Sequence, residues 1–340
     1  MNTKTKNKLH FLIGVLVCFG VATASILLEK WIPGDILGAS IIALFMGTII
    51  NSFFHPQWMK PALKFTSKKI LKLAIILLGA SLSINVVLSV GKMTLLVMIF
   101  TFAMCFGGGY FIRKWFGLNW KLGNLISAGT GICGGSAVAA IAPVIEAEDK
   151  DIAFAMSSTF LFDMIMVALY PIMGRILGMN DIAYGVWAGT SVNDTASVVA
   201  SGYAFSEAAG DFATMVKLTR TIAIIPTVLV FAYISMRLKR KQLQEVSGKR
   251  VNIIKVVPWF IVGFLAFAAL NSVGAIPENV STLLKTISKF LMVTALAAIG
   301  LGTSITDFKK AGLAPMFYGI TIDTLVTLTA LVVIWCMGLM

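Results

Sequence analysis

Residues 122–145 read LGNLISAGTGICGGSAVAAIAPVI, a run without a charged side chain. A helix that crosses a bilayer needs about 20 apolar residues, so this run is long enough to enter a membrane. Its centre is a poor helix, because four of the seven residues from Gly129 to Gly135 are glycine and each costs about 1 kcal/mol relative to alanine. The stretch therefore predicts a transmembrane segment that is interrupted within the membrane.

Apolar runs of similar length fill the rest of the chain. Of its 340 residues, 58% are hydrophobic and 13% charged, and the mean hydropathy is +0.90, which is typical of a membrane protein. Eleven candidate spans are predicted: 10–28, 36–54, 71–90, 93–112, 122–145, 152–177, 182–205, 212–236, 254–272, 290–306 and 312–339. The sequence thus predicts an all-α polytopic membrane protein, a single transmembrane domain over residues 1–340, with no soluble catalytic domain.

The positive charge of the chain has a pattern along the sequence. The formal net charge is +13, and lysines and arginines cluster in alternate loops, before the predicted first, third and fifth spans and after the eighth and tenth. Acidic residues follow the fifth span at 146–151 and the seventh at Glu207 and Asp211. The positive-inside rule then predicts a cytoplasmic N-terminus and a C-terminus on the outer side. The same placement favours a membrane protein over a nucleic-acid-binding one.

Two internal echoes suggest repeats. AGTGICGGSAVAA from Ala128 is echoed by AGTSVNDTASVVA from Ala188, and each copy places small and polar residues inside an apolar run. A second echo has a constant offset of 221 positions. It pairs Lys64 with Lys285, Ser67 with Ser288, Lys68 with Lys289, Gly79 with Gly300, Ser83 with Ser304, and Gly91 with Gly312. Inverted repeats with broken helices are typical of secondary transporters; the alternative is chance similarity between apolar segments.

Five ionisable residues fall inside predicted spans: Asp163, Asp194, Lys217, Arg220 and Asp323. Facing lipid, they would cost roughly 12–18 kcal/mol together, at about 2.5–3.5 kcal/mol each, so we expect them to face inward. One hypothesis is that Lys217 and Arg220 attract an anion while Asp163 or Asp194 holds Arg220 or carries a coupling proton. The alternative is a structural ion pair.

Other interpretations of these motifs are weaker. GTGICG fits a dinucleotide-binding pattern, but no soluble strand and helix flank it. Gly131 and Gly135 also form a GxxxG helix-packing motif, although Thr130 and Ser136 add polar groups that packing does not need. The chain has only two histidines, and its four cysteines lie within apolar runs, so neither a metal site nor a cofactor is expected. It has no nucleotide-binding motif and no nucleophile paired with a base, so neither an ATP-driven pump nor an intramembrane enzyme is expected.

With GTGICGGSAVAA at 129–140 and AGTSVNDTASVVA at 188–200 in view, the chain resembles the YeiH-type family of bacterial membrane proteins, described as sulfate exporters. The resemblance covers nearly the whole chain. It implies an inner-membrane location and a relationship to the group that contains sodium/proton antiporters, bile acid symporters and auxin carriers, with inverted repeats, crossing broken helices and a core that moves against a scaffold. The two interruptions lie in spans that the charge pattern orients the same way. Either one segment is re-entrant or this echo is not the true repeat.

The candidate substrate-binding residues come from the two interruptions and from the predicted eighth span: Thr130, Gly131, Cys133, Gly134, Gly135, Ser136, Ser191, Asn193, Asp194, Thr195, Lys217 and Arg220. Asp163, Asp194 and Asp323 are candidates for coupling or charge pairing. The expected function is alternating-access transport of a small anion, with sulfate or a related sulfur oxyanion as the implied substrate and a proton or sodium ion as the coupling ion. A cation/proton antiporter and an anion channel are the alternatives. The expected partners are the solute and the lipid bilayer, without nucleic acid, and a homodimer is left open.

Overall fold

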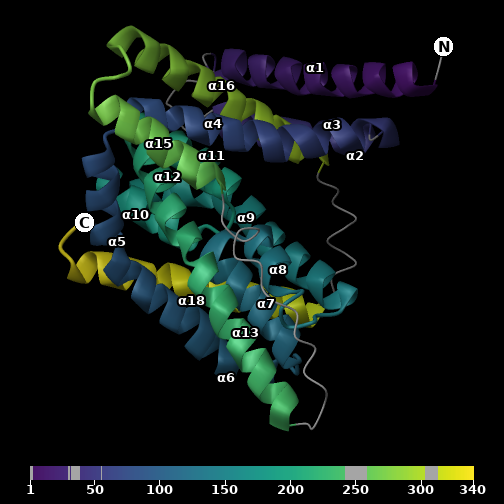
Figure 1. Ribbon diagram of the computed structural model, residues 1–340, viewed down its shortest axis with the longest axis vertical. Coiled ribbons are helices and arrows are strands. Elements are labelled where there is room, and N and C mark those ends of the chain that lie inside the picture. Colours follow the sequence, from purple (N-terminus) through teal and green to yellow (C-terminus); the bar gives the residue numbers. More distant parts are fainter. Residues whose placement is uncertain (1–2, 30, 32–38, 55, 242–258, 303–312) are drawn as a thin grey trace.

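The computed structural model describes residues 3–29, 31, 39–54, 56–241, 259–302 and 313–340, and the regular structure in this part of the chain is helical (Figure 1). Six helices are long and apolar enough to cross a bilayer: Asn7–Glu29, Ile84–Trp115, Lys150–Ile176, Glu207–Leu238, Glu278–Gly302 and Leu313–Cys336. Two shorter apolar helices, Ile41–Phe53 and Trp259–Ser272, accompany them. The chain is therefore an all-helical polytopic membrane protein, as predicted.

The helices form two groups, one above the other in Figure 1. The upper group, called the panel here, comprises α1 (Thr3–Glu29), α2 (Ala39–Phe53), η1 (Gln57–Met59), α3 (Lys60–Phe65), η2 (Thr66–Ile70), α4 (Leu71–Leu78), η3 (Gly79–Ser81), α15 (Trp259–Ser272) and α16 (Glu278–Gly302). The lower group, called the core, comprises α5 (Ile84–Phe102), η4 (Ala103–Gly108), α6 (Gly109–Trp115), α7 (Trp120–Ala128), η5 (Gly129–Cys133), α8 (Gly135–Ile141), α9 (Asp149–Ile176), α10 (Asp181–Ser191), α11 (Thr195–Phe205), α12 (Glu207–Ile222), α13 (Ile224–Lys241) and α18 (Leu313–Cys336).

Apolar packing holds each group together and joins the two. One buried cluster lies within the panel and includes Cys18 and Ala43, and another lies within the core and includes Leu125 and Ile322. A third cluster brings panel residues such as Leu78 together with core residues such as Trp187. In Figure 1, α1 begins at the right and α18 ends at the left, and these two ends of the molecule are called the N-side and the C-side below.

The predicted fifth span is a hairpin, called hairpin 1 below, and the hairpin formed by the predicted seventh span is called hairpin 2. Helix α7 runs into the π-helical turn η5, the chain reverses at Gly134 with φ +62°, and α8 returns. The two ends of the hairpin meet, because Lys121 Nζ donates a 2.6 Å hydrogen bond to the carbonyl of Glu146, and Asn119 Nδ2 lies 3.3 Å from Asp151 Oδ1. The prediction of a single crossing over 122–145 is therefore wrong.

This hairpin also corrects the charge-based topology. The acidic stretch 146–151 was expected on the opposite side from Lys121, but it lies beside that residue. The length of an apolar run does not reveal whether the chain crosses a membrane or turns back halfway, since both arrangements bury the same side chains in lipid or protein. The hairpin also resolves the conflict in orientation between the two interruptions.

The predicted seventh span is a second hairpin. Helix α10 ends at Ser191, Val192 and Asp194 are extended (ψ 136° and 146°), and α11 begins at Thr195. Ser206, after α11, donates a 2.5 Å hydrogen bond to Asp181 at the start of α10. The second prediction of a crossing, over 182–205, is thus wrong for the same reason.

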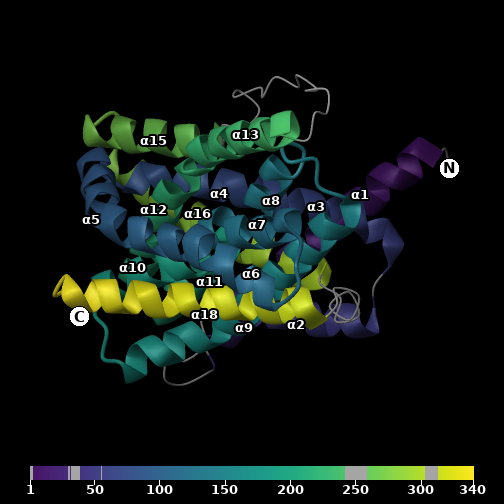
Figure 2. The ribbon, with the colours of Figure 1, turned by 90° about the horizontal axis from the view of Figure 1, so that it is seen from below.

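Helix α18 shows that the hairpins enter from opposite ends of the molecule. It runs the width of the molecule in Figure 2. Near its first turns, Tyr318 Oη contacts Ser127 of hairpin 1 at 2.9 Å, whereas beyond its last turn the carbonyl of Leu339 accepts a 2.9 Å hydrogen bond from Asn180 at the base of hairpin 2. Hairpin 1 therefore enters from the N-side and hairpin 2 from the C-side, and their tips meet halfway.

The third predicted span, 71–90, is also placed differently. The helical path begins at Lys60, α4 ends at Leu78, and Leu82 and Ser83 are extended before α5 starts at Ile84. Ser272 of α15 accepts the first amide of α5, Ile84 N, at 2.7 Å, which stabilises the new helix start. Hydropathy could not show this boundary, because the residues on both sides of it are apolar. Among the echo positions, Ser304 and Gly312 lie outside the described residues.

Candidate functional site

The candidate site lies where the two hairpin tips touch. A Cβ atom at Gly134 would lie 3.5 Å from the backbone of Asp194, and the φ angle of +62° at Gly134 is one that other residues adopt only with strain. Glycine at this position therefore allows the reversal of hairpin 1, and the 3.5 Å distance shows that the two tips are in van der Waals contact. The interruption predicted at 129–135 and the one predicted at 190–195 are both present, as a turn between two short helices.

Two cations of α12 satisfy carbonyl groups that the broken helices leave free. Lys217 Nζ donates to the carbonyls of Ile132 (2.8 Å) and Val192 (3.0 Å). Arg220 donates through Nε to Gly131 O (2.6 Å), through Nη2 to Thr130 O, and through Nη1 to Val192 O (3.4 Å). These oxygens lie at the C-terminal ends of α7–η5 and α10, where a helix has unpaired carbonyls and a negative dipole end. Both cations therefore join the two tips.

A carboxylate accepts hydrogen bonds from the free amide groups between α10 and α11. Asp163 of α9 accepts hydrogen bonds from the backbone amides of Asn193 and Asp194, both at 2.8 Å. The carboxylate of Asp194 in turn accepts from the amide of Ala196 (2.9 Å) and so caps α11. The expectation that Asp163 or Asp194 holds Arg220 is not met among the described residues, because the guanidinium binds carbonyl oxygens.

Asp323 of α18 faces the tips from a third direction. Its Oδ1 accepts a 2.9 Å hydrogen bond from Asn193 Nδ2, and the Thr130 hydroxyl lies beside the carboxylate. Four buried oxygens here have no partner with normal hydrogen-bond geometry: Thr130 Oγ1, Ser191 Oγ, Asn193 Oδ1 and Asp323 Oδ2. Buried polar atoms are usually satisfied, so such a group marks a place where water, a proton or an ion is accommodated.

The structure thus brings most of the predicted residues together. Those that are buried at the contact between the tips are Thr130, Gly131, Gly134, Ser191, Asn193, Asp163, Asp323, Lys217 and Arg220. Asp194 and Thr195 are half-buried, and Ser136 is exposed, so the first turns of α8 and α11 form the accessible edge of the site. Cys133 is a buried thiol beside them, and Gly135 is half-buried at the start of α8.

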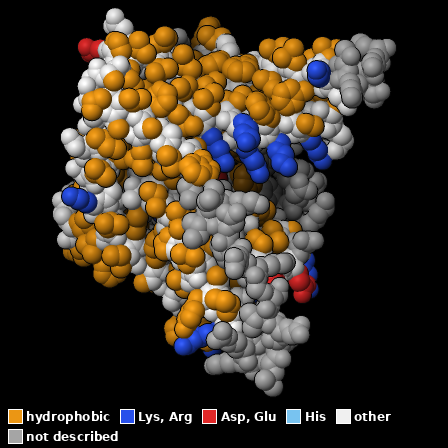
Figure 3. Space-filling view, in the orientation of Figure 1, with side chains coloured by type: hydrophobic (Ala, Val, Ile, Leu, Met, Phe, Trp, Pro, Cys, Tyr) orange, Lys and Arg blue, Asp and Glu red, His pale blue; other side chains and the backbone are white. Residues whose placement is uncertain are grey.

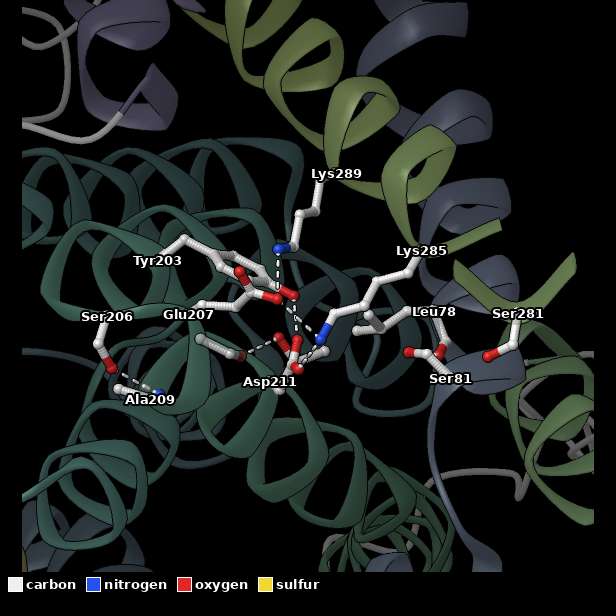
Figure 4. A network of polar contacts seen from close by, with 12 residues as sticks. Leu78, Ser81, Tyr203, Ser206, Glu207, Ala209, Asp211, Ser281, Lys285 and Lys289 are labelled. Atoms are coloured by element: carbon white, nitrogen blue, oxygen red, sulfur yellow. Dashed lines mark hydrogen bonds and ion pairs between the residues drawn. The ribbon is translucent and has the colours of Figure 1, made fainter. Parts of the chain in front are cut away.

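On the C-side, a network of polar contacts outside the two sequence motifs joins the panel to the core (Figure 4). Lys285 of α16 lies 2.8 Å from Asp211 and 2.9 Å from Glu207, both on α12, and Lys289 lies 2.6 Å from Glu207. Tyr203 of α11 donates a 2.5 Å hydrogen bond to Asp211. The echo of Lys285 and Lys289 with Lys64 and Lys68 was the only sequence signal that pointed to this network.

On the N-side, the panel presents a row of basic residues. Lys60, Lys64, Lys68 and Lys72 are spaced four residues apart along α3, η2 and α4, and all four are exposed. Figure 3 shows blue side chains along the lower edge of the panel, facing the core. No ion pair of these lysines is present among the residues that the structure describes. The two sides of the molecule thus differ: the panel lysines on the C-side form ion pairs with core carboxylates, and those on the N-side form none among the described residues.

Two cavities lie away from the tips. The larger, about 770 Å³, lies beside the C-side network and is lined by residues such as Glu29, Tyr203, Glu207 and Lys289. The other, about 500 Å³, is an apolar groove between α5 and α18. Neither of these two cavities is lined by a residue of the hairpin tips. Within the described part of the chain, no group of three or more His, Cys, Asp or Glu side chains is placed to hold a metal ion.

Helical hairpins that enter from opposite sides, with buried charges at their tips, define a multi-pass membrane protein. Residues 13–319 match the family described as Conserved hypothetical protein 698, and the chain belongs to this family. It is 49% identical over 335 residues to a UPF0324 membrane protein of Clostridium tetani, covering 96% of this chain and 97% of that protein.

Streptococcal relatives extend the comparison. A UPF0324 membrane protein of Streptococcus agalactiae is 36% identical over 308 residues, covering 88% of this chain and 89% of the relative. One of Streptococcus mutans is 35% identical over 332 residues, covering 95% and 96%. The similarity therefore includes both hairpins and the panel. The comparison with solved structures found no match.

Proposed function

We propose that this protein is a secondary transporter that carries a small anion by alternating access across the bacterial inner membrane. The observation that carries the proposal is the meeting of two interrupted hairpins from opposite sides. Lys217, Arg220 and the carboxylates of Asp163 and Asp323 are buried around their tips, and Asp194 is half-buried at the edge. Non-helical backbone at membrane depth is tolerated only inside protein or beside a wet path, and in transporters it forms the substrate site.

An inverted repeat accounts for both sequence echoes. The first repeat would contain α2, α3–α4, α5–α6, hairpin 1 and α9, and the second hairpin 2, α12–α13, α15, α16 and α18. The second repeat has the same elements in circularly permuted order, because it begins with its hairpin. Hairpin 1 therefore corresponds to hairpin 2 at an offset of 60 positions, whereas α3–α4 corresponds to α16 at an offset of 221. In support, α3 begins on the N-side and α16 on the C-side, so these paired segments run in opposite directions (Figure 1).

A pair of close packing contacts supports the same repeat. Gly79, the first residue of η3 after α4, packs so tightly against the carbonyl of Phe264 in α15 that a Cβ atom would not fit. Gly300 of α16 packs in the same way against the carbonyl of Leu44 in α2. Gly79 and Gly300 are 221 positions apart, and Leu44 and Phe264 are 220 apart. Each contact is therefore the counterpart of the other under the proposed symmetry.

The two sides of the panel suggest which state this conformation represents. On the C-side, Lys285 and Lys289 bind core carboxylates and so join panel and core. On the N-side, Lys64 and Lys68 are exposed. We interpret the C-side as the closed outer side and the N-side as the cytoplasmic side. The basic row there, together with the resemblance to YeiH-type exporters, favours an anion as the substrate, and sulfate or a related sulfur oxyanion is the first to test.

A cation/proton antiporter is the second candidate, and one observation favours it. The charged side chains at the tips are three carboxylates, Asp163, Asp194 and Asp323, and two cations, Lys217 and Arg220. When all are ionised, their sum is one negative charge. A proton or a sodium ion at Asp323, whose Oδ2 lacks a partner, would neutralise this excess. In an anion transporter the same ion would be the coupling ion.

Flux into proteoliposomes tests the proposal. We expect labelled sulfate to exchange across the membrane and to respond to an imposed pH or sodium gradient. Asp323→Asn should abolish the response to the gradient, whereas Thr324→Val, at the exposed neighbouring position of α18, should not. Proton flux driven by sodium or potassium without anion movement would support the antiporter instead, and unitary currents in planar bilayers would indicate an anion channel.

A further inference from the structure

The panel carries two lysine pairs that correspond to each other at the offset of 221. Lys285 and Lys289 lie one helical turn apart on α16, and both bind oxyanions of this chain, the carboxylates of Glu207 and Asp211. The Tyr203 ring lies 5.7 Å from Lys289 Nζ. This pair thus provides an observed example of what two ammonium groups in this arrangement bind.

The corresponding pair on the other side, Lys64 and Lys68, has the same sequence spacing but forms no ion pair with a carboxylate among the described residues. At the hairpin offset of 60, Glu207 and Asp211 correspond to Ala147 and Asp151. The first has no charge, and Asp151 already accepts hydrogen bonds from Asn119. Like charges four residues apart on a helix repel each other, so this pair lacks the compensation that its counterpart has.

The depth of the lysine row argues against lipid headgroups as the missing partner. At 1.5 Å per residue, Lys68 lies about 12 Å and Lys72 about 18 Å along the helical path from Lys60. The headgroup layer on each side of a bilayer is only about 5–8 Å thick. Lys68 also interacts electrostatically with Asp194, at the tip of hairpin 2. The row therefore leads from the N-side surface toward the accessible edge of the site.

We propose that Lys64 and Lys68 form a binding site for a dianionic oxyanion on the N-side, one step before the hairpin tips. On an α-helix, side chains four residues apart have Cβ atoms about 6 Å apart. Lys68 lies in the π-helical segment η2, but the long lysine side chains still allow both ammonium groups to contact one tetrahedral oxyanion. The anion takes the place that Glu207 and Asp211 occupy on the other side. The inference rests on the proposed function for its role as an entry site, but the binding itself is independent of transport.

Sulfate is the probe. Binding to the purified full chain in neutral detergent is measured by isothermal titration calorimetry at constant ionic strength, with chloride as the comparison ion. We expect wild type to bind sulfate, and Lys64→Gln combined with Lys68→Gln to raise the Kd by about tenfold or more for each lysine removed. The matched control, Lys8→Gln with Lys114→Gln, removes two other exposed charges and should leave the Kd unchanged. The double variant Lys64→Arg with Lys68→Arg keeps both charges and should retain sulfate binding. It tests the charge requirement if the glutamine double variant does not fold.

The results of these measurements distinguish a wrong binding site from a wrong transport function. Unchanged sulfate affinity in the Lys64/Lys68 glutamine variant, or equal loss in the control, would overturn the site. A second arm uses nanodiscs of phosphatidylcholine with or without phosphatidylglycerol. Stabilisation by phosphatidylglycerol that disappears in the variant, with no sulfate binding in phosphatidylcholine, would assign the lysines to lipid and also overturn the proposal. Sulfate binding without flux would keep this site and reject the transporter, whereas flux with unchanged KM in the variant would reject this site alone.

Discussion

Arg220 provides the sharpest test of how the hairpin tips are held. It is fully buried and donates to the carbonyls of Thr130, Gly131 and Val192, so Arg220→Met would leave three oxygens without these donors. A hydrogen bond from a charged group contributes roughly 1.5–3 kcal/mol, about 4–9 kcal/mol for three. Relief from burying a guanidinium offsets part of this, so we expect a net loss of about 3–5 kcal/mol in the free energy of unfolding.

Equilibrium unfolding in mixed micelles of neutral detergent and SDS measures this loss. Arg220→Lys keeps the charge but not the planar set of donors, and should lose about half as much. Arg113→Met is the control. Arg113 is half-buried, donates a 3.4 Å hydrogen bond to Leu118 O and lies over the ring of Tyr110, so this change should cost only about 1 kcal/mol. If Arg220→Met unfolds at the same SDS fraction as wild type but no longer transports, Arg220 is a substrate ligand, and the structural role argued here is wrong.

Three further predictions concern the tips and the C-side network. Gly134→Ala should cost about 1–3 kcal/mol in unfolding free energy because of its positive φ, whereas Gly135→Ala, with only ordinary contacts, should be close to neutral; equal effects would contradict the strain argument. Asp163→Ala removes the acceptor of the Asn193 and Asp194 amides, at about 1–3 kcal/mol for each amide that is left unpaired. Amide hydrogen exchange at the tip of hairpin 2 should therefore accelerate by about tenfold or more, and unchanged protection would show that other groups hold the tip. Lys285→Met should loosen the panel from the core and increase hydrogen exchange at the start of α12, and no change there would mean that the ion pairs contribute little.

The positions of the apolar segments followed from composition alone, but their paths did not. A hairpin with two halves of about ten residues and a single crossing helix have the same hydropathy, so 122–145 and 182–205 looked like any other span. The conflict between the charge pattern and the echo was the only sequence sign of re-entry. The break between Leu78 and Ile84 left no such sign, because Ser272, from a distant helix, stabilises the new helix start.

The site was predictable in its residues and not in its contacts. The insertion cost of charge in lipid required Lys217, Arg220 and Asp163 to point inward, and all three are buried. Their partners are backbone groups of segments up to 90 positions away, which no local pattern encodes. The prediction of a carboxylate partner for Arg220 was therefore wrong, because its partners are backbone carbonyl oxygens.

The sequence by itself determined that this protein spans a bilayer, that two segments are not continuous helices there, and which charged residues must be buried. The reason is that transfer of a charged or polar group into lipid has a large free-energy cost that depends on residue type. Only the tertiary structure decided that these segments turn back and meet from opposite sides. That outcome depends on which remote donors and acceptors satisfy the freed backbone groups, and here Lys217, Arg220 and Asp163 supply them.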